Sequence, residues 1–109
     1  MSIIQKNIFG DNVIFQVPPN YSRVLDNQLK KEILSLFNTL GMKSATIRFE
    51  NGAETKEFAG KVRLFLLDSG VTPVNTVSMG QSDIERNEFS IKQHPSDTSW
   101  AMINIGNTI

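Results

Sequence analysis

The fold is decided by the stretch Leu25–Glu50, which reads LDNQLKKEILSLFNTLGMKSATIRFE. As far as Leu40, apolar residues recur at three- and four-residue steps, which is the spacing of one face of an α-helix. From Ala45 onward, apolar and polar side chains alternate strictly, which is typical of a half-buried β-strand. This change of period predicts a small domain that combines helices with a sheet.

The first predicted helix follows Pro18-Pro19, and Asn20 or Ser22 can cap its start. Gly41 follows the last apolar position, where glycine can adopt the left-handed conformation that ends a helix. Its apolar face consists of Leu25, Leu29, Ile33, Leu36, Phe37 and Leu40. We therefore expect one amphipathic helix that packs on the sheet through this face.

A second helix is predicted from about Asn51 to Asp68, with Gly70 as its terminator. Asn51 and Glu54 are spaced like a capping box, with Asn in place of Ser or Thr. The apolar face of this helix consists of Phe58, Ala59, Val62, Phe65 and Leu66.

The remaining apolar segments are short and bounded by turn residues, so they predict strands. They are Val13–Val17, Ala45–Glu50, Thr72–Met79, Glu88–Gln93 and Ser99–Gly106. The polar connections Gly80–Asn87 and His94–Thr98 resemble hairpin links between antiparallel strands.

The order is therefore strand, helix, strand, helix, strand, strand, strand. Two helices cannot cover both faces of such a sheet, so we expect an α+β fold of two layers. Both helices then lie on one face of a mixed, mostly antiparallel sheet of about five strands. We expect one domain over residues 1–109, with residues 1–12 as an extended or hairpin arm.

The composition disfavours several function classes. Eleven basic and eleven acidic residues balance, so the chain lacks the basic surplus typical of nucleic-acid binders. With no cysteine, disulfides, thiolate catalysis and cysteine-ligated metals are excluded, and we expect no cofactor. No run approaches the roughly 20 apolar residues of a membrane span. Residues 1–9 contain no continuous apolar segment, so we expect a cytoplasmic protein without membrane contact.

Trp100 and Met102 are the most informative candidate functional residues. In the last strand they alternate with Ala101, Ile103 and Ile105, so they would lie on the sheet face away from the helices. An aromatic residue and a methionine together are typical of interface cores. This face would be covered either by the N-terminal hairpin or by a second copy of the chain.

Catalytic signals are weak. His94, Ser96 and Asp97 occur together, but they fall in a predicted hairpin loop without the buried wall that a nucleophile needs. The acidic residues Asp83, Glu85 and Glu88 do not match a calcium-binding loop. We interpret both groups as solvated turns and expect no catalytic or metal site.

One resemblance accompanies these patterns. It is carried by Asn51–Glu54, Phe58-Ala59, Leu66, Gly70, Val77–Met79 and Ile103–Gly106. These residues resemble the C-terminal part of small bacterial α/β proteins, which are often encoded in accessory or mobile genes and mostly have no assigned function. The resemblance implies an α/β fold and transfers no functional residue.

The sequence therefore favours a non-catalytic interaction domain. It would form a homodimer or bind another protein through a sheet face or an edge strand. The alternative is a small-ligand-binding protein or small enzyme with a pocket between the sheet and its loops. The polar groups of that pocket would come from Arg48, Glu50, Asp83, Glu85 and His94.

Overall fold

The computed structural model describes residues 13–16, 24–79, 84 and 88–107, and within them the protein has an α+β fold. Its elements in chain order are β1 (Val13–Gln16), α1 (Asn27–Leu40), β2 (Ser44–Glu50), α2 (Ala53–Asp68), β3 (Val74–Met79), β4 (Phe89–His94) and β5 (Asp97–Ile105). The prediction of two helices with a mixed sheet is confirmed. Neither helix in this part of the chain has the length and hydropathy needed to cross a membrane.

The strands are ordered β1-β4-β5-β2-β3, with the short β1 at one edge and β3 at the other. β2 pairs in parallel with both of its neighbours, while β4 pairs antiparallel with both β5 and β1. The prediction of a mostly antiparallel sheet is therefore wrong. The reason is that helix α2 carries the chain back from the end of β2 to the start of β3, and such a crossover makes neighbouring strands parallel.

The hairpin predicted at Gly80–Asn87 is also wrong, because β3 and β4 are separated in the sheet by β2 and β5. Sequence adjacency suggested pairing, but β3 is already placed at the far edge by its parallel pairing with β2. The second hairpin is confirmed, since β4 and β5 are antiparallel neighbours, with His94 opposite Asp97.

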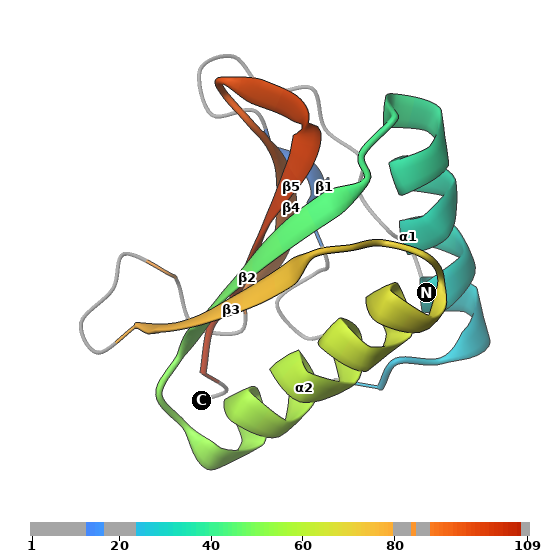
Figure 1. The fold of residues 1–109 in the computed structure, drawn as a ribbon. Helices are drawn as coiled ribbons and strands as arrows, with labels where there is room; N and C mark the ends of the chain where they lie inside the picture. The colour runs from blue at the N-terminus through green and yellow to red at the C-terminus, as the bar shows by residue number, and fades with distance from the viewer. Residues whose placement is uncertain (1–12, 17–23, 80–83, 85–87, 108–109) are drawn as a thin grey trace.

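Both helices lie on the same side of the sheet (Figure 1), and their apolar faces form one core with the strands. The centre of this core is the pairing of β2 with β5. Ala45 lies opposite Ala101 and Ile47 opposite Ile103, and all four side chains are fully buried. From α2, the Phe58 ring meets the Phe89 ring edge to face at a centroid distance of 5.3 Å.

The helix ends differ in part from the predicted caps. Helix α1 is capped by Asp26, whose Oδ1 accepts a hydrogen bond from the Leu29 N–H at 2.8 Å. The predicted caps Asn20 and Ser22 lie outside the described residues. Gly41 ends α1 with a φ of 69°, as predicted. Helix α2 begins after Gly52 without a side-chain cap, so the capping box predicted at Asn51 is wrong.

The start of α2 is instead tied to the end of β5 by Asn107. The Asn107 N–H donates to Glu50 Oε1 at 2.8 Å, and the buried Thr55 hydroxyl donates to Asn107 Oδ1 at 2.7 Å. Gly52 lies so close to this side chain that a Cβ atom there would overlap Asn107 Oδ1. The absence of a side chain at Gly52 therefore allows this contact between distant parts of the chain.

This contact generates a prediction for Gly52→Ala. Its backbone is extended, with a φ of −129°, so alanine meets no conformational penalty and only the overlap remains. Displacing Asn107 would strain the packing around Gly52 and break the hydrogen bond that the buried Thr55 hydroxyl donates to Asn107, so we expect a loss of about 1–3 kcal/mol in the free energy of unfolding. Urea denaturation measures this loss.

The matched control is Gly60→Ala, in the middle of α2. A Cβ at Gly60 meets no atom within 4 Å. That substitution should raise the free energy of unfolding by about 0.5–1 kcal/mol, because alanine is the better helix former. Equal effects of the two substitutions would contradict the Asn107 contact.

Candidate functional site

We call the sheet surface opposite the two helices the open face. The strand registers place its residues in two rows that run across the sheet. One row is Lys92, Met102, Thr46 and Asn75, and the other is Ser90, Asn104, Arg48 and Val77. Because side chains alternate along each strand, the same registers direct Ile47 and Ile103 into the core on the other side.

One end of the open face is covered, as the burial of two polar side chains shows. Ser90 and Asn104 are only 2% and 5% exposed. The Ser90 hydroxyl donates to Glu88 Oε2 at 2.6 Å, whereas the buried Asn104 Oδ1 accepts no hydrogen bond from any residue that the structure describes. Ile84, in the connection between β3 and β4, is also buried but lies outside the helix-side cluster. Alternation along a strand predicts which face a residue takes, but not what covers that face.

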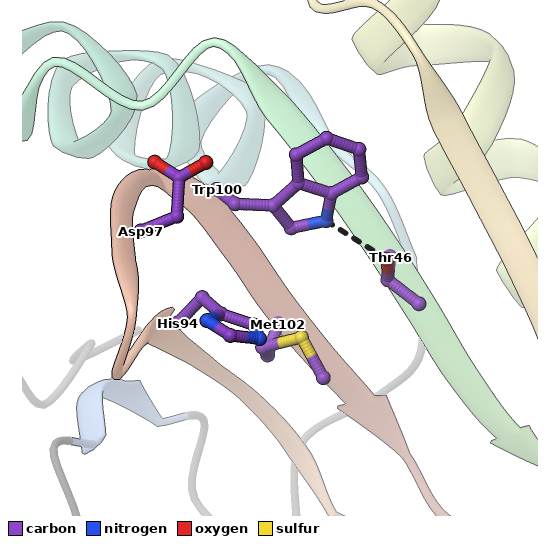
Figure 2. Close-up of a pocket in the computed structure, with 5 residues that line it drawn as sticks. All are labelled: Thr46, His94, Asp97, Trp100 and Met102. Atoms are coloured by element: carbon purple, nitrogen blue, oxygen red, sulfur yellow. Dashed lines mark hydrogen bonds between the residues drawn. The ribbon is translucent and has the colours of Figure 1, made fainter.

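Trp100 and Met102 lie at the other end of the open face, and both side chains are half-buried. The indole Nε1–H of Trp100 donates to Thr46 Oγ1 on β2 at 2.9 Å. This bond holds the ring across the β2–β5 pair, as Figure 2 shows. The N-terminal hairpin that was predicted as one possible cover includes β1, which is paired in the sheet with β4. The rest of that hairpin, residues 1–12, lies outside the described residues.

A hollow of about 380 Å³ adjoins these two side chains. It is lined by Thr46, His94, Asp97, Trp100 and Met102. In Figure 2, the indole lies between Asp97 and Thr46, while the imidazole and the thioether lie together on the opposite side. The hollow thus combines an aromatic ring, a carboxylate, an imidazole and a sulfur atom from β2, β4 and β5.

The turn between β4 and β5 orders the polar groups of this hollow. Asp97 Oδ1 accepts hydrogen bonds from the Ser99 hydroxyl at 2.6 Å and the Ser99 N–H at 3.0 Å. The hydroxyl, then the N–H, and finally the nearby His94 lower the pKa of the Asp97 carboxyl group below its usual value. His94 Nδ1 accepts a hydrogen bond from the Ser96 N–H at 3.0 Å. These bonds stabilise a turn, and none of them activates the Ser96 hydroxyl as a nucleophile.

The remaining predicted ligand residues do not converge on the hollow. Arg48 lies opposite Asn104, and the Glu50 carboxylate accepts the hydrogen bond from Asn107 near the start of α2. Asp83 and Glu85 lie outside the described residues. Of the five residues predicted for a ligand pocket, His94 alone lines the hollow within the described part of the chain.

Thr46 and Asp97 line the hollow but are not among the residues predicted for a ligand pocket. The signal for Thr46 was present, since it alternates with Ala45 and Ile47 and so faces away from the core. Its proximity to Trp100 depends on the parallel pairing of β2 with β5, which local patterns do not reveal.

Comparison of the chain with protein-family models, with curated proteins and with solved structures finds no match. The resemblance to small bacterial α/β proteins therefore stays a prediction.

Thr46→Val tests the contact that holds the indole. Valine keeps the shape of threonine but cannot accept the Nε1–H bond, so we expect a loss of about 0.5–1.5 kcal/mol in the free energy of unfolding. Trp100 is the only tryptophan, so its fluorescence anisotropy should fall as the ring gains freedom. Thr46→Ser, which retains the hydroxyl, is the control and should keep the wild-type anisotropy. An unchanged anisotropy in Thr46→Val would contradict the role of this bond.

Proposed function

We propose that the protein is a non-catalytic interaction domain that assembles with a second copy of itself along edge strand β3. The observation that carries the proposal is that β3 pairs with β2 on one side and with no other described strand. A strand in this position presents unpaired backbone donors and acceptors, which form a template for pairing with another strand.

The backbone groups on the free edge follow from the register. The Ala45 N–H donates to the Pro73 carbonyl at 3.1 Å, and Ala45 lies opposite Val74. In a parallel pair, alternate residues of a strand bond to the neighbouring strand. The N–H and C=O groups of Val74, Thr76 and Ser78 are therefore directed away from β2.

The composition of β3 favours self-pairing. Its residues, VNTVSM, include no charge, proline or glycine, although natural edge strands are commonly protected by charged residues or proline. Val77 is 44% exposed on the open face. In an antiparallel pair centred on Val77, the two Val77 side chains would contact each other, and no like charges of β3 would meet. The zero net charge of the chain adds little repulsion between copies.

The open face around Trp100 and Met102 supports a second contact surface for the same interaction function. Both side chains are half-buried, and an exposed pair of this kind is enriched at protein interfaces. This surface is independent of the β3 edge, because β2 lies between β3 and β5 in the sheet.

The edge proposal predicts that Thr76→Pro abolishes the dimer formed through β3. Proline removes an N–H that is directed outward, so pairing with a second copy is lost while pairing with β2 is retained. Light scattering behind size exclusion should give a mass near twice 12.2 kDa for the wild type and near 12.2 kDa for the variant.

Thr76→Ala, which keeps the N–H, should remain a dimer and serves as the control for the proline variant. Val77→Lys should also favour the monomer, since it places like charges opposite each other. A monomeric wild type, or a dimeric Thr76→Pro variant with wild-type circular dichroism, would overturn assembly through β3.

The face proposal predicts that Trp100→Ala or Met102→Glu weakens protein association without unfolding the monomer. The test compares the mass distributions of both variants with that of the wild type over a dilution series. Thr98→Ala, an exposed change on β5, is the control. If both Trp100→Ala and Met102→Glu associate like the wild type, the open face is not a self-association surface.

A further inference from the structure

The hollow beside Trp100 presents the face of an aromatic ring next to a carboxylate. Because Thr46 Oγ1 already accepts the indole Nε1–H, the ring offers a guest its π face rather than a hydrogen-bond donor. The face of a tryptophan ring attracts a cation that lies within about 6 Å of its centre. Figure 2 shows this ring beside Asp97, so the hollow joins a π surface to an anionic group.

Asp97 supplies an oriented negative charge. Its Oδ1 accepts both bonds from Ser99, while its Oδ2 accepts none among the described residues. Two hydrogen bonds to the same oxygen fix the direction of the exposed carboxylate, and the free oxygen remains available to a donor.

The lining residues Met102 and His94 also suit a flat, positively charged guest better than an anion. Met102 presents a polarizable thioether. In neutral His94, Nδ1 accepts the Ser96 N–H, so the ring proton is on Nε2. Lys92, the basic residue opposite Met102 on the open face, does not line the hollow and makes no ion pair with Asp97. Within the described residues, no Lys or Arg side chain lines the hollow, so His94 is the one lining group that can place positive charge near the carboxylate.

We propose that this hollow binds the guanidinium group of an arginine side chain presented by a partner protein. Guanidinium is planar and weakly hydrated, so it stacks on the indole while its N–H groups reach Asp97 Oδ2. A lysine ammonium cannot stack in this way and keeps its water more strongly. The inference depends on the proposed interaction function only for the protein source of the arginine, and it does not depend on the β3 edge.

The experiment titrates the protein with N-acetyl-arginine amide and follows the emission of Trp100, which is the only tryptophan in the chain. We expect a saturable change with a Kd of about 5 mM, as suits a single side chain on an open surface. N-acetyl-citrulline amide has nearly the same shape without the charge and should produce no saturable change. N-acetyl-lysine amide should bind at least about fivefold more weakly.

Asp97→Asn keeps the Oδ1 acceptor for Ser99 but removes the charge, so it should weaken arginine binding by about fivefold. Lys92→Ala removes a nearby positive charge and should strengthen binding. Chemical-shift changes at the Met102 methyl group provide a second readout that does not depend on fluorescence. Equal binding of arginine and citrulline amides, unchanged binding in a folded Asp97→Asn variant, or no saturation by either readout would overturn the guanidinium site.

A short peptide with one arginine between two valines tests the protein source. It should bind more tightly than the free amide, because its backbone and neighbouring side chains also contact the open face. Binding of the amide without binding of the peptide would overturn the protein source and leave a small-cation site. Repeating the titration in Thr76→Pro separates the two proposals. The hollow includes no residue of β3, so this variant should bind arginine like the wild type and test only the dimer formed through β3.

Discussion

The structure depends on the parallel pairing of β2 with β5, two strands that lie far apart in the sequence. One register sets both surfaces of the sheet, because neighbouring residues on a strand point to opposite faces. It aligns Ile47 with Ile103 beneath the helices, and it aligns Thr46 with Met102 on the open face. A shift of one residue would exchange the core with the solvent surface, so the fold and the candidate site are specified together.

The second constraint is the number of helices. Two amphipathic helices cover one side of a five-stranded sheet, so no described helix shields the opposite side from solvent. Ser90 and Asn104 are buried at one end of the open face, whereas Trp100 and Met102 remain half-exposed at the other. The candidate binding hollow lies at this less protected end, beside the turn that orients Asp97.

Because there are only two described helices, the edge strand β3 is covered by helix over only part of its length. Val74, at its start, is buried against the helix side, but Thr76 and Ser78 point to that side and remain exposed. Helix α2 therefore protects only the beginning of the edge strand. The edge strand and the aromatic hollow, on which the two proposals depend, occur on separate strands of one sheet.

The sequence by itself determined the class of fold, the apolar faces of both helices and the inward positions of the strands, because these follow from local periodicity. It also indicated that Trp100 and Met102 share a face. Only the tertiary structure decided that β5 inserts between β4 and β2, which brought Thr46 to the indole and moved β3 to the edge. The physical reason is that strand pairing depends on hydrogen bonds between distant segments, and no short stretch of sequence specifies its partner.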